Sequence, residues 1–265
     1  MSGVIANVRR GLKRVIALVV GAVWLVVAPA SPAAPVEDAS VMPPGATLTD
    51  LQPGVVRRLS DERTITRWAY ARRRANIQSQ PSGSSRVLGT VRYYSSSGVD
   101  EVYGVLAVTA DSQGRRWLRV RLPMRPNGRT GWIPEDALGQ LQVSQQQLTI
   151  NRRTLRATLF DKGRKVWSSR IGVGAASTPT PSGTYYVTAR VSSKEFGPAY
   201  GNWTFMTTAY SRLLDWPGGG VVGVHGTNRP GLIPGRPSHG CVRIRNSDMA
   251  KLAARMKTGT PITIT

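Results

Sequence analysis

Short runs of alternating apolar and polar residues dominate the chain after residue 65, and turn-forming residues separate these runs. Clear examples are Val87–Val91, Tyr103–Val108 and Trp117–Leu122. Their length, their period of two and their content of β-branched and aromatic residues are typical of strands. The Pro126-Asn127-Gly128 cluster is typical of a turn between strands. The pattern therefore predicts a mainly β protein, with a small all-β barrel over residues 65–140.

The same pattern starts again after Gly139 and continues to the end of the chain. The predicted strands there include 147–151, 154–160 and 166–174. Near the end, apolar residues at helical spacing predict a helix from Ser247 to Lys257, with Asn246 or Ser247 as its N-cap. Residues 145–265 are therefore interpreted as a second, mostly β domain.

The first β domain ends on Thr130-Gly131-Trp132-Ile133-Pro134. A strand of alternating apolar residues, then a hairpin, then Gly-Trp-Ile resembles the end of bacterial SH3-like domains. The resemblance implies that residues 65–140 form an SH3-like β-barrel.

The first 30 residues have the pattern of an export segment. Met1–Arg14 contains four basic and no acidic residues, and Val15–Ala28 is uncharged and apolar. This apolar stretch is shorter than the roughly 20 residues of a membrane span, and small residues suited to signal-peptidase cleavage follow it. Residues 1–30 are predicted to be a signal peptide or a signal anchor. The rest of the chain is therefore expected outside the cytoplasm, in the periplasm or at the outer face of the plasma membrane and in the cell wall. Residues 31–64, with their Pro, Ala, Gly and Ser, are interpreted as a linker.

The chain is strongly basic, with 36 Lys and Arg against 14 Asp and Glu and a formal net charge of +22. It contains no zinc-finger pattern and no basic run interleaved with aromatic residues, so no nucleic-acid partner is expected. Two interpretations of the charge remain open. One is a solvated, arginine-rich surface, and the other is attraction to a polyanionic envelope polymer or a membrane.

The scarcest residue types carry the candidate chemistry. The chain has one cysteine, Cys241, and two histidines, His225 and His239, all within 17 residues. A single cysteine excludes an internal disulfide, and an unpaired thiol outside the cytoplasm needs an explanation. A thiol becomes a good nucleophile at neutral pH when a neighbouring base takes its proton, and histidine can be that base. A Cys–His nucleophile pair, a zinc site and plain core residues are the three interpretations of this stretch.

The spacing around these residues favours the nucleophile pair. Val221–Val224 predicts a buried strand that delivers His225, and a proline- and glycine-rich loop leads back to Gly240-Cys241 and another strand. A loop that leaves one strand and returns to a neighbouring strand places its two ends in contact. No fourth metal ligand stands out, so we expect no metal. The imidazole is expected to lower the pKa of the Cys241 thiol below its free value of about 8.5.

The sequence around the thiol also resembles a known family. SHGCVR at 238–243, preceded by HGTN at 225–228, resembles the signature of the L,D-transpeptidase catalytic domain of the YkuD type. Further segments that resemble the motifs of this family, in the same order, are PTPSGTYY at 179–186, FGPAYG at 196–201 and GTPI at 259–262. The resemblance spans residues 145–265 and implies a β-sandwich catalytic domain with one or two short helices.

The resemblance assigns roles to individual residues. Cys241 would be the acylated nucleophile, His225 its base, and the Gly226 carbonyl the group that orients the imidazole. The residues expected to form the substrate and oxyanion environment are Ser238, His239, Gly240 and Arg243. Asn246 is assigned a helix cap and no catalytic role.

The resemblance also implies a function. The implied protein is an exported enzyme that takes part in cell-wall organisation and in determining cell shape. It acts on peptidoglycan stem peptides through a cysteine thioester. Such an enzyme releases D-alanine, forms 3→3 cross-links, needs no cofactor and is acylated by carbapenems. Anionic wall polymers are further candidate partners. An L,D-carboxypeptidase, which uses water as the acceptor, and a non-catalytic wall-binding protein are the alternatives.

Overall fold

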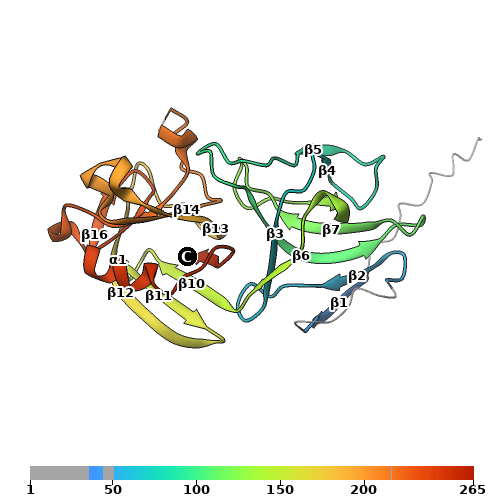
Figure 1. The fold of residues 1–265 in the computed structure, drawn as a ribbon, viewed down its shortest axis with the longest axis horizontal. Helices are drawn as coiled ribbons and strands as arrows, with labels where there is room; N and C mark the ends of the chain where they lie inside the picture. The colour runs from blue at the N-terminus through green and yellow to red at the C-terminus, as the bar shows by residue number, and fades with distance from the viewer. Residues whose placement is uncertain (1–35, 44–50, 216) are drawn as a thin grey trace, which may run out of the picture. The chain divides into compact units, whose positions relative to one another are not determined.

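Two β-sheets form the framework of the described chain (Figure 1). The structure is a computed structural model that describes residues 36–43, 51–215 and 217–265. Within these residues the protein is mainly β, as the sequence predicts. The predicted export segment, residues 1–30, lies outside them. No helix in the described part of the chain is both long and apolar enough to cross a bilayer.

The first sheet pairs its strands in the order β1-β2-β6-β7-β8-β4-β5, and β3 pairs with β6 and β9. Its strands are β1 (Val36–Val41), β2 (Val55–Arg58), β3 (Thr66–Tyr70), β4 (Asn76–Gln78), β5 (Val87–Thr90), β6 (Val102–Ala110), β7 (Arg116–Arg121), β8 (Thr130–Pro134) and β9 (Gln142–Ser144). Its buried residues include Val105, Leu118 and Ile133, which lie on the central strands β6, β7 and β8. The runs that the sequence marks as strands form this core.

The segment interpreted as a linker, residues 31–64, contributes two strands to this sheet. β1 pairs with β2 in parallel, and β2 pairs with β6 through Arg57 and Arg58. The prediction of a linker is therefore wrong for these strands. Their sequences, VEDASV and VVRR, mix charged and apolar residues without a clear alternation, so nothing in the local pattern marks them as strands. The sheet supplies the pairing that the pattern does not predict.

The second sheet contains β10 (Gln146–Asn151), β11 (Arg156–Asp161), β12 (Arg164–Gly174), β13 (Gly183–Ser192), β14 (Trp203–Thr207), β15 (Val224–His225), β16 (Gly235–Ser238), β17 (Val242–Ile244) and β18 (Pro261–Ile264). The order β11-β10-β18-β13-β14-β15-β17-β12 closes on itself because β12 also pairs with β11, and β16 adds to the side of β12. These eight strands form a barrel rather than the expected sandwich.

Two long strands make this closure possible. The first part of β12 pairs with β11 up to Arg170, whereas Ile171 and Gly172 pair with β17. In the same way β13 pairs first with β18 and then, from Val187 onward, with β14. Each long strand therefore bridges two groups of strands, and the barrel encloses one apolar cluster.

One α-helix occurs in the described part of the chain, α1 (Asn246–Ala253), and short 3₁₀ turns such as η3 (Pro198–Tyr200) and η4 (Pro217–Gly220) lie in the loops. The apolar positions that predict the helix, Met249, Leu252, Ala253 and Met256, are all buried. The N-cap is Arg245, and it makes no side-chain capping hydrogen bond. The prediction that Asn246 or Ser247 caps the helix is therefore wrong.

The described residues of both sheets belong to one compact unit. Arg121 of β7 pairs with Glu62 at 2.6 Å, and the Tyr186 hydroxyl of β13 donates a hydrogen bond to the same carboxylate. Gly104 is required at this contact, because a Cβ atom there would lie 1.9 Å from the Tyr186 ring. The first sheet therefore packs directly against the barrel that carries the candidate chemistry.

Candidate active site

Neighbouring parallel strands hold the histidine and the cysteine. In the pairing of β15 with β17, Val224 lies beside Val242 and His225 beside Arg243. Cys241 immediately precedes β17, and the N–H of Gly223 donates to its sulfur at 3.3 Å. Because side chains alternate along a strand, Cys241 and Arg243 project to the same side, and both line one cavity with His225. The loop between the strands thus brings its two ends together, as the spacing predicts.

Cys241 lies where two cavities meet. One, of about 280 Å³, also contains His225, Tyr200, Ser211 and Arg243 in its wall. The other, of about 460 Å³, is largely apolar, and its wall comprises Val191, Phe196, Met206 and Val221, together with Ser97 and Val99 from the loop between β5 and β6. The thiol is therefore reachable from two sides, and one of these approaches is partly formed by the first sheet.

The protonation of His225 is fixed by its backbone partner. Its Nδ1 lies 2.6 Å from the carbonyl oxygen of Gly226, and the ring is buried. A carbonyl oxygen can only accept a hydrogen bond, so Nδ1 carries the proton and Nε2 keeps a lone pair. The Tyr200 ring packs on the imidazole with 4.7 Å between ring centroids. The imidazole is thus held as a neutral base, with the Gly226 carbonyl in the position that the resemblance implies.

A network of hydroxyl groups shapes the turn before the cysteine. The buried Ser238 hydroxyl donates to the Cys241 carbonyl at 2.6 Å and accepts from the Gly240 N–H at 3.2 Å. The Gly240 carbonyl accepts from Thr180, and the carbonyl of the exposed His239 accepts from Ser211, both at 2.8 Å. Gly240 has φ +127°, a conformation that a side chain would strain. These bonds fix the backbone that presents the sulfur.

Burial sets the protonation of the catalytic pair in the resting protein. Burial lowers the pKa of His225, the Gly226 hydrogen bond raises it, and the positive charge of Arg243 lowers it. Together these effects bring the pKa of His225 to about 4. Burial also raises the pKa of the Cys241 thiol, although the Gly223 N–H and Arg243 oppose this shift. The expectation of a thiol pKa below its free value is therefore wrong. Both shifts favour the neutral forms, a thiol and an imidazole, at neutral pH.

We predict that alkylation of Cys241 by iodoacetamide accelerates only above about pH 8.5, because desolvation raises the pKa of this thiol above that of a free one. The rate is measured against pH in the folded protein. The same protein unfolded in urea is the control, since its only cysteine then titrates as a free thiol. A midpoint in the folded protein below that of the unfolded protein would contradict the assignment.

Asn246 has a role that the sequence does not reveal. Its Oδ1 accepts a hydrogen bond from the N–H of the buried Thr227 at 2.9 Å, within the turn that follows His225. A Cβ atom on Gly226 or Gly201 would lie 2.3 Å or 2.1 Å from this oxygen. Asn246 is therefore a positioning residue for the turn whose carbonyl orients the imidazole. Two features of the sequence point to this role of Asn246. They are the glycines of the HGTN and GPAYG segments and the presence of an asparagine soon after the cysteine.

Replacing Asn246 by alanine should lower the free energy of unfolding by about 1–3 kcal/mol, because the buried Thr227 N–H loses its acceptor. Urea unfolding measures this loss. Asn246→Asp keeps an oxygen at the same place and is the matched control, which should retain most of the stability. Equal destabilisation by both substitutions would show that the hydrogen bond is not what Asn246 contributes.

Arg243 lies at the edge of the site with part of its hydrogen-bonding capacity unused. It is half-buried in the wall of the Cys241 cavity, and its Nε is buried without a hydrogen-bond partner. Its charge favours the thiolate at Cys241 and disfavours the imidazolium at His225. These effects suit a group that assists attack by the sulfur.

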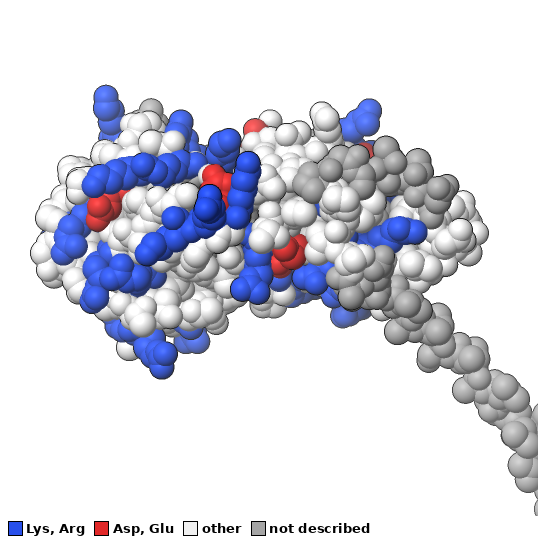
Figure 2. All heavy atoms as spheres, turned by 90° about the horizontal axis from the view of Figure 1, so that it is seen from below, with Lys and Arg blue, Asp and Glu red and all other residues white. Residues whose placement is uncertain are grey.

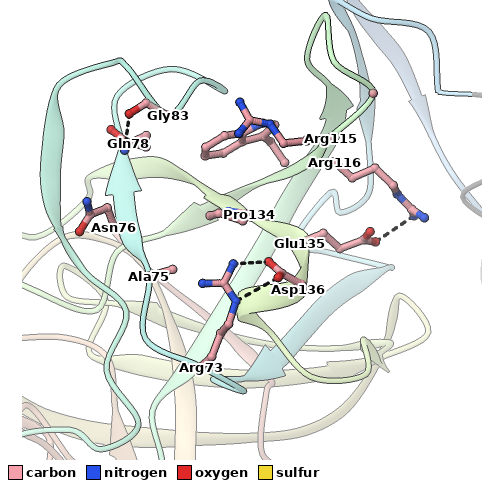
Figure 3. A pocket seen from close by; sticks show the side chains of 12 residues that line it. Arg73, Ala75, Asn76, Gln78, Gly83, Arg115, Arg116, Pro134, Glu135 and Asp136 are labelled. Carbon is pink, nitrogen blue, oxygen red and sulfur yellow. Dashed lines mark hydrogen bonds and ion pairs between the residues drawn. The ribbon is translucent and has the colours of Figure 1, made fainter.

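No second candidate catalytic or metal site is evident among the other described residues. Among the described residues, no group of three or more His, Cys, Asp and Glu is arranged to hold a metal ion. A hollow of about 580 Å³ in the first sheet is lined by charged residues, but Arg73 pairs there with Asp136, and Arg116 with Glu135 (Figure 3). The face seen in Figure 2 carries many more Lys and Arg than acidic residues. The Cys241 cavities therefore remain the candidate site among the described residues.

Comparison with known proteins agrees with this geometry. Residues 145–264 match the family model described as the L,D-transpeptidase catalytic domain, YkuD. Two curated proteins named as L,D-transpeptidases YkuD are similar, one from Bacillus licheniformis (32% identity over 118 residues) and one from Bacillus subtilis (31% over 117 residues). Each alignment covers 44% of this chain and 63% of the relative. The chain thus spans just under two thirds of the length of these relatives.

Solved structures with overall similarity are more distant. An L,D-transpeptidase from Enterococcus faecium is 17% identical with a TM-score of 0.40, over 72% of this chain and 74% of that one. An L,D-transpeptidase from Mycobacterium smegmatis is 16% identical with a TM-score of 0.37, over 57% and 90%. The assignment rests on the family model and the curated relatives instead. Residues 145–264 of this protein are an L,D-transpeptidase catalytic domain of the YkuD family.

Proposed function

We propose that the protein is an exported L,D-transpeptidase that joins peptidoglycan stem peptides through a thioester on Cys241. The observation that carries the proposal is the fixed tautomer of His225. The Gly226 carbonyl holds the proton on Nδ1, and the free Nε2 belongs to an imidazole that shares its cavity with the thiol. This is the arrangement that a cysteine acyl transfer requires.

In the first step, Nε2 of His225 takes the thiol proton as Sγ of Cys241 attacks the carbonyl of the third residue of a stem tetrapeptide. A C–S bond forms, and the carbonyl oxygen becomes an oxyanion. The C–N bond to the terminal D-alanine then breaks, and the imidazolium returns its proton to the leaving amine. D-Alanine departs, and the rest of the peptide stays on the sulfur as a thioester.

In the second step, the side-chain amine of a neighbouring stem attacks the thioester. His225 takes a proton from this amine and gives it to the departing sulfur, which restores the thiol and leaves a 3→3 amide link. Water in place of the amine would release a tripeptide, which is the L,D-carboxypeptidase reaction. The two cavities that meet at Cys241 support separate approaches for the donor and the acceptor.

The N–H of Cys241 is the proposed oxyanion donor. The neighbouring amides already have partners, because Gly240 donates to the Ser238 hydroxyl and Val242 donates to the Gly223 carbonyl at 2.9 Å. A backbone N–H aimed at the developing charge contributes to catalysis because it needs no reorganisation during the reaction.

The remaining parts of the proposal concern location and partners. The basic and apolar pattern of residues 1–30 supports export. The first sheet is proposed to be an SH3-like module that binds the cell wall, and the net charge of +22 would assist on anionic wall polymers. A carbapenem is proposed to acylate Cys241. An L,D-transpeptidase of Mycobacterium tuberculosis has been solved with a faropenem-derived adduct.

Incubation of the full chain with a disaccharide-tetrapeptide, followed by mass spectrometry, tests the proposal. A cross-linked dimer with free D-alanine supports the transpeptidase. A tripeptide without a dimer would replace it with the carboxypeptidase. Unchanged substrate would leave only the wall-binding function, and a pull-down with purified peptidoglycan would then measure that function directly.

A further inference from the structure

A basic hollow of about 660 Å³ lies beside the catalytic turn and has no part in the mechanism above. Three arginines line it: Arg125 from the loop between β7 and β8, Arg152 from the turn after β10, and Arg212 from the loop after β14. Its other walls include Pro179, Thr180 and Ser182, which belong to the PTPSGTYY segment. The hollow thus combines a motif of the catalytic domain with a residue of the first sheet.

Two of these arginines are held in place by hydrogen bonds. Arg125 donates through Nη2 to the carbonyls of Ser211 and Leu213, both at 3.1 Å, and its guanidinium lies 4.6 Å above the Tyr210 ring. Arg152 donates through Nη1 to the Thr180 carbonyl at 2.8 Å and through Nε to the Thr265 oxygen at 3.1 Å. These bonds fix the positions of both guanidinium groups. Neither group pairs with an Asp or Glu side chain of the described residues.

None of the described residues that line the hollow is Asp or Glu. Asp215 directly follows Leu214, which lines the hollow, but Asp215 itself is not one of the lining residues. The exposed Arg212 forms no hydrogen bond or ion pair with any described residue. Three arginines without a described Asp or Glu in the lining favour a negatively charged ligand.

The hollow is coupled directly to the nucleophile. Thr180 and Ser211, which line it, donate to the successive carbonyls of Gly240 and His239, both at 2.8 Å. Ser211 also lines the cavity that contains Cys241 and His225. The hollow and the Cys241 cavity therefore share Ser211 as part of their walls. A peptide of a few residues can extend from one to the other, because an extended chain covers about 3.4 Å per residue.

The side chain of Asn127, in the loop between β7 and β8, stabilises this arrangement. The Asn127 amide donates to the Tyr210 carbonyl at 2.7 Å, and the Tyr210 N–H donates to Asn127 Oδ1 at 3.1 Å. This reciprocal pair, together with Arg125, holds the segment that leads into Ser211 and Arg212. The loop between β7 and β8 therefore helps to build the hollow.

We propose that this hollow, lined by Arg125, Arg152 and Arg212, is a subsite that binds a free carboxylate of the acyl-donor peptide. The inference rests on the proposed function, because it takes the ligand to be the peptide whose carbonyl reaches Cys241. Arginine suits a carboxylate because its planar fork donates two parallel hydrogen bonds. The subsite would select donors that carry free carboxylates over the same donors carrying amides.

The test compares the binding of two peptides to the full-length Cys241→Ala protein by calorimetry. One is a stem tetrapeptide with free carboxylates, and the other is the same peptide with these groups converted to amides. The free acid is expected to bind at least about tenfold more tightly. Arg212→Gln should reduce this preference to less than about threefold. Arg164→Gln, which removes the same charge from the exposed first residue of β12, is the matched control and should leave the preference unchanged.

Several outcomes would overturn the inference. Equal binding of the acid and the amide would do so, and so would an equal loss of preference in Arg164→Gln, which would indicate a general effect of net charge. If Arg212→Gln impaired binding of poly(glycerol phosphate) but not the peptide preference, the hollow would be a site for wall polymer instead. Binding does not require turnover, so the inference can fail while the enzyme still makes dimers. Conversely, an inactive enzyme can still prefer the acid.

Discussion

The Cys241→Ala protein is expected to release D-alanine from a stem tetrapeptide at least about 1,000-fold more slowly than the unmodified protein, at the level of the background. The reason is that the thioester cannot form without the sulfur, so the enzyme loses the covalent step and not merely a binding contact. The release of D-alanine is measured under conditions of enzyme excess. The substitution removes a partly exposed side chain, so the fold should be retained.

Two controls make this result interpretable. Circular dichroism and urea unfolding establish that the Cys241→Ala protein is folded. Thiol labelling reports on one residue only, because the chain has a single cysteine. If the folded variant still released D-alanine at more than a tenth of the normal rate, the nucleophile would have to be another group.

The His225→Gln protein is expected to lose about 100- to 10,000-fold in kcat/KM, because the His225 imidazole, whose Nδ1 is held by the Gly226 carbonyl, is the base assigned to take the thiol proton. The pH profile of the unmodified enzyme should have an acid limb near pH 4, since burial keeps the imidazole neutral down to that value. Activity should therefore be nearly complete by pH 6. The limb should be absent in His225→Gln.

The same burial affects stability. The pKa of His225 is lower in the folded protein than its ordinary value of 6.5. Its contribution to the free energy of unfolding is therefore complete above about pH 6.5 and is lost as the pH falls through 4. His239→Gln is the matched comparison, because His239 is an exposed residue whose carbonyl accepts a hydrogen bond from Ser211. A larger loss of activity in His239→Gln than in His225→Gln would reverse the assignment of the base.

Local patterns in the sequence predict the strands that form the hairpins. β10, β11 and β12 follow one another through short turns, and each places alternate residues such as Leu148 and Leu159 in the core. The stripe that predicts α1 is buried as expected. These elements can be recognised because burial on one face leaves its period in the sequence.

The closure of the barrel and the pairing of β1 with β2 depend on contacts distant in sequence. β12 changes partners between Arg170 and Ile171, and no local pattern records this change. β1 and β2 gain their partners only from the sheet that they join. Pairing of distant segments is decided by packing, which a single sequence does not display.

The candidate site is the part that the sequence locates best, because its residue types are scarce. One cysteine and two histidines in one short stretch are enough to identify Cys241 and His225 as candidates. The role of Asn246 depends on the return of α1 to the turn after His225, which is a tertiary contact. The direction of the Cys241 pKa depends on burial, which the pattern of neighbouring residues does not fix.

The most direct test of acyl transfer through Cys241 is the mass of the enzyme trapped during turnover. The full chain is mixed with a stem tetrapeptide at pH 7, quenched with acid after a short time, and analysed intact and after digestion. We expect a mass increase equal to the donor minus D-alanine, located on the fragment that contains Cys241 and absent from Cys241→Ala. A mass increase on another residue, or one that persists in Cys241→Ala, would contradict the assignment of Cys241 as the nucleophile.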